Sequence, residues 1–127
     1  MSRTVPRCYT VAEANATLPL VRRIVEDVVT AHARWRGLVD EFEVASVRNR
    51  ADRPDPRAAA LQREAQAVAR EIDSFRLELR GLDVELRAFD VGLVEFPASV
   101  GGHPARLAWR LGEPGVRPAR DRGRHAA

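Results

Sequence analysis

The chain has 127 residues, the length of a single domain that can bury a hydrophobic core without a metal or a disulfide to hold it. Its one cysteine excludes an intramolecular disulfide framework, and no apolar run approaches the roughly 20 residues that a membrane helix needs, so we expect a cytoplasmic protein without a membrane anchor. All 21 basic residues are arginine, but their excess over the 18 acidic residues comes from segment 115–127, so the composition does not favour nucleic acid as a partner.

The first helix is predicted to begin at "TVAE". Thr10 and Glu13 form a capping box, in which each side chain accepts a hydrogen bond from the backbone N–H of the other residue. Pro19 removes one backbone hydrogen bond from this helix, so it should either kink the helix or break it near residues 15–18. The apolar seam of the helix recurs at steps of three and four residues: Leu18, Val21, Val25, Val28, His32, Trp35, Val39 and Phe42.

A polar segment with two prolines, 48–57, is typical of the connection to a second helix. Two helices with matching seams and a short connection predict an antiparallel coiled-coil hairpin, and a second copy of the chain should complete a four-helix homodimer. The second seam consists of Leu61, Ala65, Val68, Ile72, Phe75, Leu79 and Leu82. The residues that widen the first seam, and so favour a dimer, are Leu20, Ile24, Val29 and Leu38.

Gly81 should end the second helix, and a small antiparallel sheet should follow. The fold class is therefore α+β, a long antiparallel helical hairpin followed by a three-stranded antiparallel β-meander, in one domain over 1–114. Residues 115–127, rich in Arg, Pro and Gly, are predicted to be a basic, disordered tail. The strands are predicted over 84–90, 93–97 and 106–111, with turns at Asp90-Val91-Gly92 and Gly101-Gly102.

The alternation of side chains separates the meander into two faces. Simple hairpin registers place Glu95 opposite Arg87 on one side and opposite Ala108 on the other. Arg106 and Arg110 then lie on the diagonals, so three arginines surround Glu95. The face predicted to pack on the helices holds Val84, Leu86, Ala88, Val94, Phe96, Leu107, Trp109 and Leu111. The opposite face holds Glu85, Arg87, Phe89, Leu93, Glu95, Arg106 and Arg110.

This charged cluster has two interpretations. One is a cross-strand salt-bridge network, in which each pair contributes roughly 0.2–1 kcal/mol. The other is a binding site, because three arginines against two glutamates leave one cation uncompensated, and a guanidinium fork suits a carboxylate or a phosphate. Surrounding arginines favour an ionised carboxylate, so Glu95 suits orienting a ligand better than carrying a proton. The candidate ligand-binding residues are Glu95, Arg87, Arg106 and Arg110, with Asp90 and Glu113 at the ends of the sheet.

The remaining chemistry-bearing residues do not form a recognised motif. His32 lies on the first seam, where we expect a partly buried core residue, with a functional role as the alternative. The three histidines and one cysteine are scattered, and the chain contains no glycine-rich phosphate loop, serine nucleophile elbow or CxxC motif. We therefore expect neither a metal nor a cofactor.

Three separated motifs resemble a bacterial family called domain of unknown function 2203. They are "YTVAEANATLPLVRRI" (9–24), "GLVEFP" (92–97) and "LAWRLGEP" (107–114). Ala108 stands where the family has a cysteine, and segment 115–127 departs from the family's usual continuation, which argues against catalysis or metal binding. The residues that match the family pattern are Glu13, Asn15, Leu18, Pro19, Asp90, Gly92, Leu93, Val94, Glu95, Phe96, Pro97, Trp109, Arg110, Gly112, Glu113 and Pro114.

The resemblance implies no established activity, so three hypotheses remain. The first is a cytoplasmic, non-catalytic homodimer that binds a protein partner or a ligand through its helices and its arginine-rich sheet face. The second is a small enzyme, or a sensor for an anionic metabolite, that acts at the candidate residues around Glu95. The third is nucleic-acid binding through segment 115–127.

Overall fold

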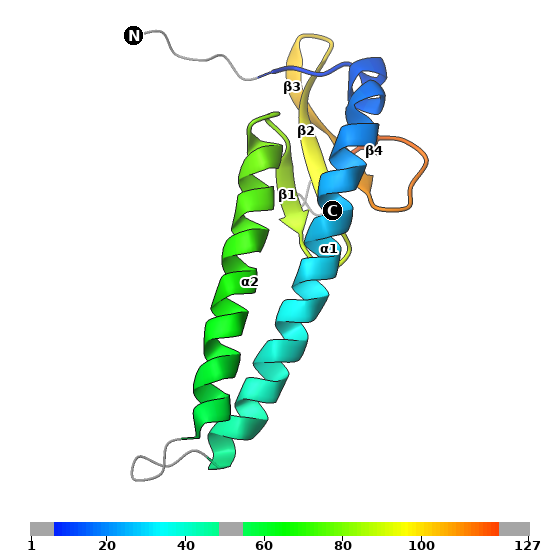
Figure 1. Ribbon diagram of the computed structural model, residues 1–127. Coiled ribbons are helices and arrows are strands. Elements are labelled where there is room, and N and C mark those ends of the chain that lie inside the picture. Colours follow the sequence, from blue (N-terminus) through cyan, green and yellow to red (C-terminus); the bar gives the residue numbers. More distant parts are fainter. Residues whose placement is uncertain (1–6, 49–54, 120–127) are drawn as a thin grey trace, which may run out of the picture.

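The computed structural model describes residues 7–48 and 55–119. Two long helices lie side by side and antiparallel, and a four-stranded antiparallel sheet covers the half of the hairpin where α1 begins and α2 ends (Figure 1). The elements are α1 (Val11–Arg48), α2 (Pro56–Arg80), β1 (Glu85–Ala88), β2 (Leu93–Val100), β3 (His103–Arg110) and β4 (Arg117–Pro118). The α+β class and the helical hairpin are therefore confirmed, but the sheet has four strands where three were predicted.

Helix α1 begins at the predicted capping box. The backbone N–H of Thr10 donates to Glu13 Oε1 at 2.9 Å, and the N–H of Glu13 donates to Thr10 Oγ1 at 3.0 Å. These two bonds satisfy donors that have no partner inside the helix, so the start of α1 is set by residues three apart in the sequence.

Helix α1 continues through Pro19, so the break considered near residues 15–18 does not occur. A proline forfeits one backbone hydrogen bond of the helix. Leu18 and Val21, on either side of Pro19, are buried in the core, and this burial offsets the lost bond and holds the segment helical.

Helix α2 begins at Pro56, behind the N-cap residue Asp55. The Oδ1 atom of Asp55 accepts a hydrogen bond from the backbone N–H of Arg57 at 2.9 Å. The last residues of the predicted connection 48–57 therefore belong to the cap and first turn of α2, whereas residues 49–54 lie outside the described part of the chain.

Helix α2 ends at Gly81, as predicted, but Gly81 does not adopt the left-handed conformation that usually favours glycine at a helix end. Its φ is −62°. The left-handed residue of the connection to β1 is Asp83, with φ 61°. The carboxylate of Asp83 accepts a hydrogen bond from the backbone N–H of Arg7 at 2.9 Å, which ties the segment before α1 to this connection.

The face of α1 that packs on α2 departs from the predicted seam beyond Val28. His32 and Val39, which were placed on the seam, are only half buried and lie at its edge. A helix has 3.6 residues per turn, so an apolar stripe drifts by about 20° per heptad from a seam that repeats every 3.5 residues. The buried residues in this half of α1 are Ala31, Leu38 and Ala45.

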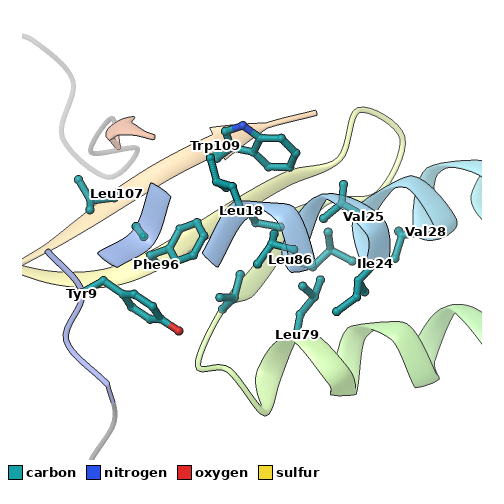
Figure 2. Close-up of a cluster of buried hydrophobic side chains, with 14 of the residues drawn as sticks. Tyr9, Leu18, Ile24, Val25, Val28, Leu79, Leu86, Phe96, Leu107 and Trp109 are labelled. Carbon is teal, nitrogen blue, oxygen red and sulfur yellow. The ribbon is translucent and has the colours of Figure 1, made fainter. Parts of the chain in front are cut away.

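The main core lies between the sheet and the covered half of the hairpin, as the predicted core face implies. Figure 2 shows Phe96 and Trp109 from the sheet beside Leu18 and Val25 of α1, with Leu79 of α2 close by. Both aromatic side chains are fully buried. In the other half, the two helices form a smaller core with each other, and none of the strands in residues 7–48 and 55–119 covers them there (Figure 1).

Strand β4 lies within 115–127, the segment predicted to be a tail. Arg117 pairs with Ala108 of β3, and the backbone N–H of Ala119 donates to β3 at 3.0 Å. A two-residue strand is too short to show an alternation in the sequence, so the pattern carried no sign of it. Residues 120–127 lie outside the described part of the chain.

Within the ranges that the structure describes, neither helix has the length and apolarity required to cross a bilayer.

Candidate functional site

Glu95 lies at the centre of the sheet, on β2. Its neighbours Val94 and Phe96 point into the core, so the Glu95 side chain lies on the face turned away from the helices. On β3 its partner is Ala108, as the predicted register required. Glu95 is the one buried charged residue in the described part of the chain.

The pairing of Glu95 with β1 differs from the prediction. Its partner there is Glu85 rather than Arg87. The turn pairs Ala88 with Leu93, one step from the predicted register, and the irregularity between Leu86 and Ala88 adds a second step. The irregularity is a β-bulge, in which one strand carries an extra residue that has no partner on the other strand. Arg87 occupies this position and has no partner on β2 in the ladder.

The bulge still leaves Arg87 beside Glu95, and Arg106 approaches Glu95 from β3. Glu95 Oε1 accepts a hydrogen bond from Arg106 Nη1 at 3.3 Å and lies 3.7 Å from Arg87 Nε. The side chain of Glu95 is 9% exposed, whereas that of Arg106 is 60% exposed. Arg87 also contacts Glu85 at 3.2 Å. The carboxylate therefore lies beneath the guanidinium groups.

Arg110 does not join this cluster, so two of the three predicted arginines contact Glu95. Among the described residues Arg110 forms no ion pair with Glu95, and its backbone N–H donates to Glu113 Oε1 at 2.7 Å. The other oxygen of Glu113 accepts a hydrogen bond from Arg117 Nε at 2.9 Å. This bond is the main reason that the pKa of Glu113 lies below its ordinary value.

Arg117 was not among the predicted site residues, because segment 115–127 was assigned to a tail. Its spacing of four residues from Glu113 is the only sequence signal for the ion pair, and this signal is weak outside a helix. The pair forms because β4 adds to the edge of the sheet and carries Arg117 over Ala108.

Phe89 and Asp90 do not lie with Glu95 either. Phe89 was placed on the charged face, but it packs against the helices, and its ring centroid lies 6.0 Å from that of His32. Because the bulge inserts one extra residue, side chains after Arg87 point to the opposite face from the one that regular alternation predicts, and this explains the position of Phe89. Asp90 Oδ1 accepts a hydrogen bond from the backbone N–H of Val91 at 2.9 Å and so stabilises the β1–β2 turn.

The charged residues on the outer side of the sheet form one surface, which we call the arginine face. Its four arginines outnumber its three glutamates, so it carries one net positive charge. In the described part of the chain, no group of histidine, cysteine and acidic side chains is arranged to hold a metal ion. The arginine face consists of Arg87, Arg106, Arg110, Arg117, Glu85, Glu95 and Glu113.

The three sequence motifs that carry the family resemblance meet in space, and their contacts maintain the fold. Asn15 Oδ1 accepts a hydrogen bond from the N–H of Val116, and Trp109 Nε1 donates to the backbone oxygen of Glu113, both at 2.9 Å. Gly92 packs so closely on α1 that a Cβ atom would lie 2.6 Å from a valine methyl group. These contacts give Asn15, Trp109 and Gly92 roles in maintaining the fold, and none of the three contacts requires a reaction.

A family model described as "Uncharacterized conserved protein (DUF2203)" matches residues 7–119. No curated protein and no solved structure matches the chain.

Proposed function

This chain belongs to the DUF2203 family, whose description names no activity, and we propose that it is a cytoplasmic, non-catalytic binding module whose arginine face docks an acidic segment of a protein partner. The observation that supports this proposal is the layering of charge around Glu95. The carboxylate is buried and the guanidinium group of Arg106 above it is exposed. Such a surface offers cations to a partner, while its own carboxylates hold those cations in place.

The spread of the arginines favours a polypeptide partner. They lie on three different strands, β1, β3 and β4, so they are distributed across the sheet instead of converging on one point. An acidic segment with several carboxylates can contact such a surface at several places, and electrostatic complementarity then sets its orientation.

The alternative of an acid–base enzyme is less well supported by this geometry. A carboxylate that exchanges protons near neutral pH needs a raised pKa. The hydrogen bond from Arg117 instead lowers the pKa of Glu113, and Glu95 is engaged by Arg106. The glutamates of the arginine face are thus suited to orienting arginines.

The test is the binding of a labelled oligoglutamate peptide, measured by fluorescence anisotropy at low and high salt. We expect saturable binding that weakens with salt and becomes at least about tenfold weaker in Arg106→Gln/Arg110→Gln. Arg23→Gln/Arg70→Gln, which removes the same charge from exposed positions on the helices, is the matched control. Equal binding by the two double variants would overturn the proposal. Tighter binding of succinate or inorganic phosphate than of the peptide would favour the metabolite sensor.

We also propose a homodimer through the uncovered half of the hairpin. An apolar hollow of about 190 Å³ lies between the helices there. Its α1 wall carries large half-buried residues, and its α2 wall carries two alanines beside Gln62 and Gln66. The alanines leave room for a helix of a second copy, and the glutamine amides can hydrogen-bond to it. Light scattering at micromolar concentration should give the mass of a dimer, and Val39→Glu should give a monomer. The lining residues include Trp35, Val39, Phe42, Ala65 and Ala69.

A further inference from the structure

A second hollow, separate from the arginine face, lies between α1 and the β1–β2 turn. Its volume is about 490 Å³, within the range of roughly 300–1,000 Å³ that is common for small-molecule sites. We call it the His32 hollow. The residues that line it are Val29, His32, Ala33, Arg36, Phe89 and Asp90.

We propose that the His32 hollow binds a small organic monoanion in which a carboxylate is joined to an apolar group and lies beside a hydroxyl or amino group. The proposal rests on three properties of the hollow, which are its fixed floor, its unpartnered cationic and donor groups, and the carboxylate at its rim.

The floor of the hollow is apolar and held in place by packing. Val29 and Phe89 both pack against the main core. Gly92, at the end of the β1–β2 turn, fits so tightly on α1 that a Cβ atom there would lie 3.0 Å from a methyl group of Val29. The turn therefore cannot move away from the helix without opening the core, and the walls of the hollow are preorganised.

The donor groups of the hollow have no partner in the described part of the chain. His32 is held by ring contacts alone, with its centroid 5.8 Å from that of Trp35 and 6.0 Å from that of Phe89. Within residues 7–48 and 55–119, no hydrogen bond or ion pair engages the imidazole of His32 or the guanidinium of Arg36. The two residues are four apart on α1, so they project from the same side of the helix.

The chemistry of these groups defines the ligand. The guanidinium fork of Arg36 can bind a carboxylate through two parallel hydrogen bonds, and His32 can donate a third. Val29 and Phe89 offer an apolar surface to the rest of the molecule. Asp90, whose Oδ1 takes only the N–H of Val91 among the described residues, repels a second negative charge and accepts from a hydroxyl or an amine.

The test uses phenyllactate as the probe, with ¹³C-labelled histidine and NMR detection of the His32 imidazole in the full chain. We expect a saturable shift of the His32 signal, without a shift of His103, and a dissociation constant of about 1 mM or below. Arg36→Gln should weaken binding at least about tenfold, whereas Arg23→Gln, an exposed arginine on the same helix, should leave it unchanged.

Two further comparisons make the result specific. Asp90→Asn should weaken the binding of phenyllactate more than that of phenylacetate, which lacks the hydroxyl group. Arg36→Gln should leave oligoglutamate binding at the arginine face intact, so failure of one proposal does not imply failure of the other. The absence of a saturable shift with phenyllactate up to about 10 mM, or an unchanged shift in a folded Arg36→Gln protein, would overturn the inference.

Discussion

The side-chain oxygen of Asn15 accepts a hydrogen bond from the backbone N–H of Val116 at 2.9 Å, although the two residues are 101 positions apart. This bond joins the second turn of α1 to the segment that leads into β4. Gly115 lies against the same side chain, where a Cβ atom would be 3.1 Å from Oδ1. The first turns of α1 and the segment before β4 are therefore joined through one side chain.

Replacing Asn15 tests how much this bond stabilises the fold. Asn15→Ala removes the acceptor, and we expect the free energy of unfolding to fall by about 0.5–1.5 kcal/mol. Asn15→Asp keeps an oxygen in the same place and should remain close to the unaltered protein. Urea unfolding of the three proteins gives the comparison, and equal stability of the two variants would show that the bond contributes nothing.

Gly92 is limited by space as well as by its backbone conformation. Gly92→Ala places a methyl group 2.6 Å from Val25 Cγ1, at a residue with φ 69°. Gly101 has a similar φ of 58° but no atom within 4 Å of the position of a Cβ. We expect Gly92→Ala to cost about 1–3 kcal/mol more than Gly101→Ala, because only the former overpacks the core. Thermal unfolding of both variants measures the difference, and similar losses would contradict the close approach.

Glu95 should contribute more to stability than the exposed glutamate that shares Arg87 with it. Glu95→Gln removes the buried negative charge that Arg87 and Arg106 contact. We expect the free energy of unfolding to fall by about 1–2 kcal/mol. Glu85→Gln breaks an ion pair whose glutamate side chain is 63% exposed, and it should cost less than about 0.5 kcal/mol. Chemical unfolding of both variants at neutral pH measures the two losses of stability. A smaller loss for Glu95→Gln than for Glu85→Gln would be inconsistent with a buried, engaged carboxylate.

Glu113 should make stability depend on pH in the acid range. Because its pKa in the folded protein lies below the ordinary value of 4.5, its charge stabilises the fold above about pH 4.5, and this contribution is lost as the pH falls through the folded pKa. Glu113→Gln should therefore be less stable than the unaltered protein at neutral pH and approach it at about pH 3. Urea unfolding across this range is the measurement.

Arg117→Gln is the companion variant, since the hydrogen bond from Arg117 is the largest cause of the lowered pKa. It should remove much of the pH dependence that Glu113→Gln removes, and the double variant should add little to either single change. A pH dependence that persists unchanged in Arg117→Gln would assign the effect to other groups.

Much of the fold is encoded by residues close in sequence, and these parts were predicted correctly. The capping box of Thr10 and Glu13 depends on two groups three residues apart, so its prediction needs no tertiary structure. The partner of Glu95 on β3 follows from the turn at Gly101 and Gly102, both of which have positive φ. Local geometry alone therefore placed Glu95 opposite Ala108.

The rest of the candidate site depends on contacts between distant segments. The bulge at Arg87 accompanies the packing of Phe89 on α1, and together with the pairing of Ala88 and Leu93 at the turn it makes Glu85, not Arg87, the partner of Glu95. No pattern within β1 reveals this, because the side chain that selects the register belongs to a helix more than fifty residues earlier. Asp90, predicted to lie at the end of the sheet near Glu95, instead lines the hollow beside His32.

The sequence by itself determined the two helices, the alternation of the strands and the burial of the core face, since each depends on spacing within one segment. Only the tertiary structure decided which charges meet. Arg117 reaches Glu113 because Asn15 holds the segment before β4, and His32 faces a hollow because the β1–β2 turn packs on α1. The physical reason is that a salt bridge or a pocket needs side chains from several segments at once, and their positions are set by the packing of the whole core.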